Sequence, residues 1–179
     1  MCCSNYRGIS LINTGYKVLS LILLERLTTG VDYQIGDYQC GFRKNRSTVD
    51  QIFTIRQLME KCWEYNRTSH QLFIDFKQAY DSIIQADLWN AMTELNIPKK
   101  LIKITKACVE GSTSAVRVEG KISSSFTINN GLKQGDALSP ILFNIVLESI
   151  VRKTNTETLL FRNQCPNMIL AFADDIKIV

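Results

Sequence analysis

The chain ends in two adjacent acids that stand between two apolar runs, and this pair constrains the fold most. Residues 169–173 are apolar, Asp174 and Asp175 follow, and residues 176–179 alternate around Lys177. Apolar runs on either side of a short polar break are typical of a β-hairpin, here residues 169–179 with the acids at its tip. Each of two neighbouring carboxylates makes the other harder to ionise, and a divalent cation removes that cost. The pair therefore predicts a metal site and suggests a third acid upstream.

Asp75 is the candidate for this third acid, because it also ends a short apolar run, residues 72–74. Strand ends are rigid supports for metal ligands, and the carboxylates converge if the two strands are neighbours in one sheet. Oxygen ligands without His or Cys favour Mg²⁺ or Mn²⁺ over zinc. Two such ions can activate an attacking hydroxyl and stabilise a leaving phosphate oxygen. The three acids favour phosphoryl or nucleotidyl transfer, whereas an isolated Asp-Asp pair is usually a solvated turn.

The composition allows one folded domain and argues against several classes of protein. Of 179 residues, 45% are hydrophobic and 21% are charged, with a formal net charge of +4. This mild basic excess is compatible with nucleic-acid binding but does not require it. Six cysteines without a C-x-x-C pair, and the single histidine His70, argue against a zinc site. The longest apolar run, residues 18–24, is too short to span a bilayer and lacks a signal-peptide pattern, so we expect neither a membrane nor a secreted protein.

Helical and extended patterns alternate along the chain, which is typical of an α/β or α+β fold. Apolar residues at helical spacing predict helices over residues 16–27, 47–65, 86–96, 98–109 and from Ser139-Pro140 onward. Ser47 and Asp50 have the spacing of a capping box at the start of the second helix. Short or alternating apolar runs predict a strand over residues 72–76, a hairpin over 114–128 and the acid-tipped hairpin.

Five ordered blocks of the chain resemble the successive motifs of reverse transcriptases. Their residues are most similar to the motifs of non-LTR (LINE-like) retrotransposons. The blocks are Asn5-Tyr-Arg7-Gly-Ile-Ser-Leu11, Gln39-Cys-Gly-Phe-Arg43, Phe73-Ile-Asp75-Phe-Lys-Gln-Ala-Tyr80-Asp81, Gly131-Leu-Lys-Gln134-Gly135-Asp-Ala-Leu-Ser139-Pro140-Ile-Leu-Phe143-Asn144 and Phe172-Ala-Asp174-Asp175. The resemblance covers essentially the whole chain. It implies an α+β right-hand polymerase fold with a fingers-like helical part over residues 1–66 and a mainly palm part over residues 67–179. The palm would be an antiparallel sheet backed by helices, with a ferredoxin-like or RRM-like core, and the thumb would be absent.

The same resemblance implies the roles of the site residues. The catalytic acids would be Asp75, Asp174 and Asp175, which would bind two Mg²⁺ or Mn²⁺ ions together with the backbone carbonyl of Phe76. The nucleotide would be bound by Arg7, Phe76, Ala79, Tyr80, Gln134 and Gly135. Arg7 would contact the triphosphate, the Tyr80 ring would exclude a ribose 2′-hydroxyl, and Gln134 and Gly135 would border the nascent base pair. The template backbone would be held by Arg43, Lys44 and Arg46.

The resemblance therefore implies an RNA-directed DNA polymerase whose partners are an RNA template, a DNA primer and dNTPs. It also implies endonuclease and thumb domains of the same polyprotein, and an intracellular location in cytoplasm and nucleus as a ribonucleoprotein. The family's upstream fingers lysine has no counterpart before Asn5, and no thumb follows Val179. We therefore expect a truncated piece with little activity alone. Two alternatives remain open: a non-catalytic nucleic-acid-binding remnant or maturase-like RNA binder, and a palm polymerase that copies DNA.

Overall fold

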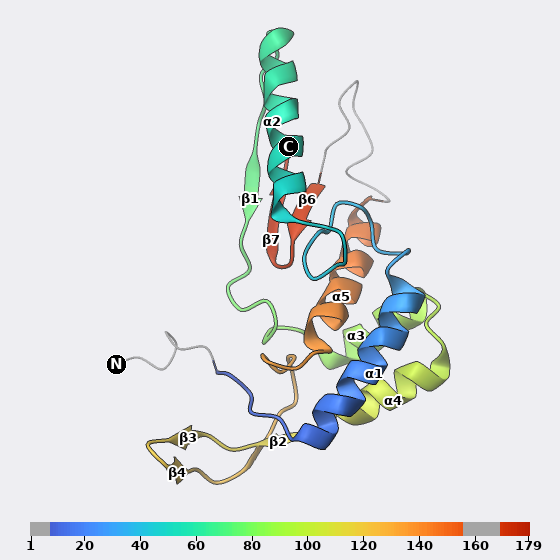
Figure 1. Ribbon diagram of the computed structural model, residues 1–179, viewed down its shortest axis with the longest axis vertical. Coiled ribbons are helices and arrows are strands. Elements are labelled where there is room, and N and C mark those ends of the chain that lie inside the picture. Colours follow the sequence, from blue (N-terminus) through green and yellow to red (C-terminus); the bar gives the residue numbers. More distant parts are fainter. Residues whose placement is uncertain (1–7, 156–168) are drawn as a thin grey trace.

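The structure is a computed structural model that describes residues 8–155 and 169–179 (Figure 1). Its elements are α1 (Thr14–Val31), α2 (Thr48–Glu64), β1 (Leu72–Ile74), α3 (Gln85–Glu94), α4 (Lys99–Val109), β2 (Thr113–Ser114), β3 (Arg117–Val118), β4 (Lys121–Ile122), β5 (Phe126–Thr127), α5 (Ser139–Asn155), β6 (Ile169–Phe172) and β7 (Asp175–Ile178). The fold is mixed, with small antiparallel sheets and helices, as the sequence predicts.

The main sheet brings together the two strands that carry the acids. Its order is β1-β7-β6, and both pairings are antiparallel. Ile74 pairs with Ile176, and Phe172 pairs with Asp175 across the tip of the hairpin. The strand before Asp75 thus neighbours the acid-tipped hairpin, which is the condition under which the acids lie at the same end of the sheet. On the free side of β6, Gln39 forms an isolated parallel bridge with Ala171.

One face of this sheet packs on the helices. Ala171 and Ile176 belong to a core that also includes the fully buried Leu88 and Met92 of α3 and Leu142 of α5. The inward face of α3 is the one that helical spacing predicts, because Leu88, Met92 and Leu95 are at most 1% exposed. In Figure 1, α1, α3 and α4 gather around the lower part of α5, while the sheet lies at its upper end.

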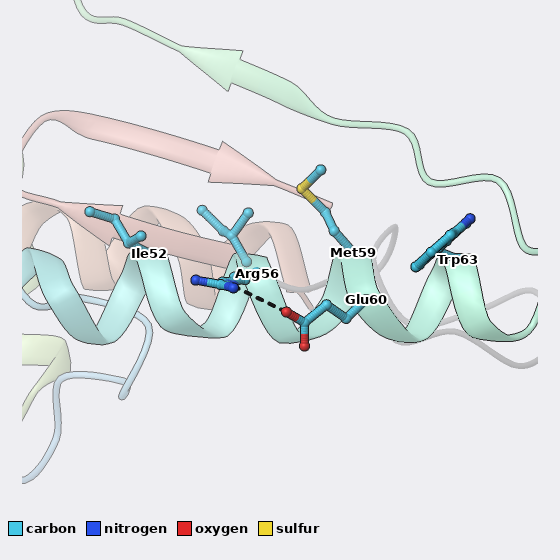
Figure 2. Close-up of a pocket in the computed structure, with 6 residues that line it drawn as sticks. Ile52, Arg56, Met59, Glu60 and Trp63 are labelled. Atoms are coloured by element: carbon cyan, nitrogen blue, oxygen red, sulfur yellow. Dashed lines mark hydrogen bonds and ion pairs between the residues drawn. The ribbon is translucent and has the colours of Figure 1, made fainter.

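Helix α2 lies apart from this core, along β1 and the β6–β7 hairpin (Figure 1). The predicted capping box is present: the Ser47 hydroxyl accepts from the Asp50 backbone N–H, and the Asp50 carboxylate accepts from the Ser47 N–H. The apolar face that the spacing predicts is formed but not buried. Figure 2 shows Ile52, Met59 and Trp63 along a shallow groove on this helix, beside the Arg56–Glu60 ion pair.

Three boundaries differ from the sequence expectations. Strand β1 ends at Ile74, so Asp75 and Phe76 follow the strand instead of closing it. Helix α1 spans Thr14–Val31 and is therefore longer at both ends than the predicted range of residues 16–27. The expected hairpin over residues 114–128 consists of two short ladders, β2–β5 and β3–β4, with Gly120 in the left-handed region at the tip. No helix in residues 8–155 or 169–179 is long and apolar enough to cross a membrane.

Candidate active site

The sheet register places two of the three predicted acids on the face that points away from the core. Directly opposed residues of an antiparallel pair lie on the same face, and neighbours along a strand alternate. Since Ile74 and Ile176 pack against the core, Asp175 points the other way and is exposed. Asp75 is exposed, follows β1 directly and lines the same cavity as Asp175. Asp174 lies in the two-residue turn between β6 and β7.

The donor chemistry of these acids fits a hard cation such as Mg²⁺, because it consists of carboxylate oxygens on neighbouring strand ends. The side chains themselves are not drawn together: in the described parts of the chain, no group of three or more His, Cys, Asp or Glu side chains could hold a metal ion. The strands thus place the three acids at one end of the sheet.

A cavity next to the turn collects most of the predicted nucleotide-binding residues. It has a volume of about 680 Å³, and its lining includes Phe76, Ala79, Tyr80, Gln134, Gly135 and Asp174. These residues come from three blocks that lie far apart in the sequence. The hydrogen bond from Leu132 N–H to Tyr80 O (2.9 Å) joins two of the blocks, and the bond from Gly131 N–H to Ile83 O (2.8 Å) lies two residues beyond the end of the Phe73–Asp81 block. The structure therefore brings together five of the six predicted nucleotide-binding residues beside one of the three acids.

Tyr80 is held firmly in this cavity. Its ring stacks on that of Phe143 in α5, with centroids 5.1 Å apart, and Phe76 meets the same Phe143 edge to face at 6.5 Å. Burial, together with the negative charge of Asp174, raises the pKa of Tyr80 to about 12. Its hydroxyl is buried and has no hydrogen-bond partner among the described residues. The ring is thus a rigid wall beside Asp174, and its hydroxyl stays protonated at neutral pH.

Gly135 adopts a backbone conformation that a side chain would disturb. Its φ is +102°, and a Cβ atom there would lie 3.2 Å from the Ser10 carbonyl oxygen. The adjacent Gln134 carbonyl accepts a 2.9 Å hydrogen bond from the Ser10 N–H. This contact ties the cavity wall to the N-terminal segment. The predicted triphosphate ligand Arg7 lies just before that segment, outside the described residues, and stays a prediction.

Arg43 is placed differently from what the resemblance implies. Its side chain is only 5% exposed, and it donates to the Asp32 carboxylate and to the carbonyl oxygens of Asp32, Gly36 and Gln39 at 2.7–3.0 Å. A guanidinium with four of its N–H groups engaged inside the protein is not available to template phosphates. Arg43 is therefore an internal brace of the 32–43 loop. Lys44 and Arg46 are the exposed members of the predicted set, and Arg46 pairs with Asp37.

Two residues of the same block contact the site without having been assigned a role. Phe42 is 63% exposed and lines the cavity of Tyr80. Gln39 is fully buried and hydrogen-bonded to Ala173, the residue before Asp174. The sequence offered only their membership in the Gln39–Arg43 block as a signal, because both contacts are formed with distant parts of the chain, 134 positions away in the case of Gln39 and Ala173.

Comparison with known proteins identifies the family. The reverse transcriptase (RNA-dependent DNA polymerase) family matches residues 3–179 of this chain. The Pol polyprotein of the retrotransposable element R2DM from Drosophila melanogaster is 26% identical over 172 residues, which are 96% of this chain and 16% of that protein. The RNA-directed DNA polymerase from mobile element jockey of Drosophila funebris is 28% identical over 177 residues, 98% of this chain and 19% of that protein. The chain thus spans less than a fifth of the length of these relatives.

Solved telomerase structures share the fold. Telomerase from Candida tropicalis, in complex with a TWJ fragment of telomeric RNA, has a TM-score of 0.63 at 19% identity, over 92% of this chain and 28% of that one. Apo telomerase from the same organism, truncated from its C-terminal domain, has a TM-score of 0.57 at 20% identity, over 92% and 33% of the two chains. At these identities the likeness concerns the fold alone. The family match over nearly the whole length decides the assignment: the chain belongs to the reverse transcriptases and is related to the RNA-directed DNA polymerases of non-LTR retrotransposons such as R2 and jockey.

Proposed function

We propose that this chain forms the fingers and palm region of a retrotransposon polymerase that joins dNTPs to a primer 3′-hydroxyl on an RNA template. Residues 1–66 would form the fingers-like part and residues 67–179 the palm. The observation that carries the proposal is the cavity that gathers Tyr80, Gln134, Gly135 and Asp174 at the end of the acid-bearing sheet. A volume of about 680 Å³ lies within the range of nucleotide-sized ligand sites.

The carboxylates of Asp75, Asp174 and Asp175 and the carbonyl of Phe76 would hold two Mg²⁺ or Mn²⁺ ions. When bound, such ions lower the pKa of the attacking hydroxyl and neutralise charge on the leaving phosphate oxygens. The chain itself would supply orientation. The stacked Tyr80 ring would lie under the sugar and leave no space for a 2′-oxygen. Gln134 and Gly135 would border the base pair, and the missing side chain of Gly135 lets the segment around Ser10 pack closely behind them.

The template would be bound by charge. Lys44 and Arg46 are exposed on the loop that precedes α2, and phosphate contacts by such side chains are independent of sequence and sensitive to salt. Arg7 would contact the triphosphate through its guanidinium. We further propose that the chain works within a longer polyprotein that supplies endonuclease and thumb domains, as a ribonucleoprotein in cytoplasm and nucleus.

The test is a primer-extension assay with an RNA template, dNTPs and Mg²⁺, on the chain with whatever sequence flanks it in its reading frame. We expect Asp174→Ala to abolish extension and Glu25→Gln, an exposed carboxylate on α1, to leave it unchanged. Extension by Asp174→Ala at the wild-type rate would refute the assignment. RNA binding by the wild type without any extension would favour the non-catalytic binder, and a preference for a DNA template in competition would favour the DNA-copying polymerase.

For the isolated residues 1–179 we propose little or no processive synthesis. Long extension products from this polypeptide alone would contradict that part of the proposal.

A further inference from the structure

The side chain of Gln39 clamps the turn that carries the acids. Its Nε2 donates to the carbonyl oxygen of Ala173 at 3.1 Å, and its Oε1 accepts from the Ala173 N–H at 2.9 Å. The same Oε1 accepts from the Gly41 N–H at 2.8 Å. Gln39 is 0% exposed, so water does not compete for these bonds. One amide group thus satisfies both backbone polar groups of the residue that precedes Asp174.

The clamped residue has an unfavourable backbone conformation. Ala173 has a φ of +56°, in the left-handed region that residues with a Cβ atom rarely adopt. Such a conformation persists only where the surrounding structure holds it, and it occurs frequently at active sites. Here the two bonds from Gln39 supply that hold. A relaxed Ala173 would turn the following peptide and move the carboxylate of Asp174 with it.

Gly41 closes the same contact from the other side. A Cβ atom at this position would overlap the backbone nitrogen of Ala173 and lie 2.8 Å from its Cα atom. The loop and the turn are therefore packed backbone to backbone. Two backbone hydrogen bonds also join this loop to β6. They run from Cys40 N–H to Ala171 O and from Ala171 N–H to Tyr38 O, and both are 2.8 Å long.

The loop that supplies Gln39 is itself fixed to α5. The buried Asn144 donates from Nδ2 to the Gly41 carbonyl at 3.0 Å. The buried Glu148 accepts from the Gly36 N–H at 2.9 Å and from the Tyr38 hydroxyl at 2.7 Å. With the Arg43 brace, these bonds make the loop a rigid support, so the position of Gln39 is set by the core helix and not by the turn.

We propose that Gln39, supported by Gly41, is a positioning residue for the metal-binding acids: its buried amide fixes the Ala173 turn and thereby the places of Asp174 and Asp175. The inference rests on the proposed function, because it concerns the same acids. It goes beyond that function in assigning the Gln39–Arg43 block to the geometry of the hairpin instead of to the template. Removal of a group that orients a metal ligand without binding the metal typically weakens metal affinity tenfold to a hundredfold.

The test compares Gln39→Met, Gln39→Glu and Gly41→Ala in the protein as its full reading frame encodes it. Met has a similar length and forms none of the three bonds, whereas Glu keeps an acceptor for the two N–H groups and loses the donor to Ala173 O. The exposed Gln57→Met, on α2, is the matched control. The readouts are the Mn²⁺ dissociation constant from electron paramagnetic resonance, the hydrogen exchange of the Ala173 amide, and the dissociation constant for template and primer.

We expect Gln39→Met to raise the Mn²⁺ dissociation constant about tenfold or more and to speed exchange at Ala173, with template binding within about twofold. Gln39→Glu should lie between Met and wild type, and Gly41→Ala should resemble Met. A purely structural role would weaken template and metal binding alike in proportion to the unfolded fraction, which would overturn the inference. If Gln39→Met does not fold, wild-type metal affinity in both Gln39→Glu and Gly41→Ala would overturn it.

Asp174→Ala distinguishes failure of the positioning role from failure of the proposed function. Loss of Mn²⁺ binding in Asp174→Ala with wild-type behaviour of Gln39→Met refutes the positioning role alone. Unchanged Mn²⁺ binding and unchanged activity in Asp174→Ala refute the proposed function, and the positioning role falls with it.

Discussion

Tyr80 and Asp174 line one cavity, and this arrangement provides a physical basis for the proposed discrimination between sugars. The ring is immobilised by its stack on Phe143, so it cannot move aside for an extra oxygen. We expect Tyr80→Ala to raise incorporation of ribonucleotides relative to deoxyribonucleotides, on the order of tenfold to a hundredfold, because the wall is removed. Tyr80→Phe keeps the ring and should retain the wild-type ratio. The measurement is kcat/KM for paired rNTP and dNTP substrates, and an unchanged ratio in Tyr80→Ala would remove the ring from the sugar pocket.

Arg43 and Lys44 are neighbours in sequence with opposite surroundings. Arg43→Ala leaves the carbonyls of Asp32 and Gln39 without the donor they have here and removes one of two donors to the Gly36 carbonyl. We expect it to lower the free energy of unfolding by roughly 2–3 kcal/mol. Arg43→Lys should recover little of this, because an ammonium cannot match the planar fork. Lys44→Ala should stay within about 0.5 kcal/mol of wild type. Urea denaturation of the three variants decides this, and equal stabilities would contradict an internal brace.

At this scale the resemblance indicates which residues line the cavity, and strand alternation accounts for the face on which Asp175 lies, whereas the roles of these residues stay predictions. Strand alternation sets the faces of Asp175 and Ile176, and a glycine marks the close approach at residue 135. The position of Arg43 could not be predicted in the same way. A basic residue beside Lys44 and Arg46 has the pattern of a surface cluster, and only the tertiary arrangement shows that Asp32 and two loop carbonyls enclose it.

For helix α2 the start and the apolar face could be predicted from the sequence, whereas the exposure of that face could not. Its start is fixed by the capping box of Ser47 and Asp50, which the sequence predicts and the structure contains. Its apolar spacing predicts a helix with one apolar face, and the face is present. The spacing does not say what covers that face. No residue of α2 is buried, and Trp63 is 87% exposed.

This difference predicts unequal costs for substitutions at apolar helix positions. We expect Ile52→Gln and Met59→Gln on α2 to change the free energy of unfolding by no more than about 0.5 kcal/mol, because both side chains are already exposed to water. Leu88→Ala on α3 and Leu142→Ala on α5 should each cost about 2–5 kcal/mol, because they leave cavities in the core. Urea denaturation of the four variants measures the contrast. A loss of 2 kcal/mol or more from an α2 variant would show that its apolar face is covered.

Across the whole molecule, three tyrosines join segments that are distant in sequence. The Tyr16 hydroxyl of α1 donates to the Asp136 carboxylate at 2.5 Å, and the Tyr38 hydroxyl donates to Glu148 of α5 at 2.7 Å. Tyr80 lies near Asp174. In each case burial is the largest cause that raises the tyrosine pKa above its ordinary value of 10.0, and the nearby carboxylate raises it further. The protonated hydroxyls of Tyr16 and Tyr38 thus help to hold a loop against α1 and another loop against α5.

This arrangement predicts that the fold loses stability in alkali. Below pH 10 these tyrosines are protonated in both the folded and the unfolded chain, so their full contribution is present. Above pH 10 the unfolded chain releases these protons while the folded chain keeps them, so the free energy of unfolding falls as pH rises toward the folded pKa, about 12 for Tyr80. The measurement is urea denaturation on both sides of pH 10, with tyrosinate absorbance reporting ionisation.

Tyr38→Phe provides the control for this decline, because it removes one such proton and leaves lysine titration unchanged. The variant should be less stable than wild type at neutral pH, because it loses the hydrogen bond from Tyr38 to Glu148. The Glu148 oxygen then accepts only from the Gly36 N–H. Its stability should decline less steeply above pH 10, so that the two curves approach each other. Parallel curves would mean that Tyr38 ionises alike in the folded and unfolded chains. The link between the 32–43 loop and α5 would then not depend on a protonated hydroxyl.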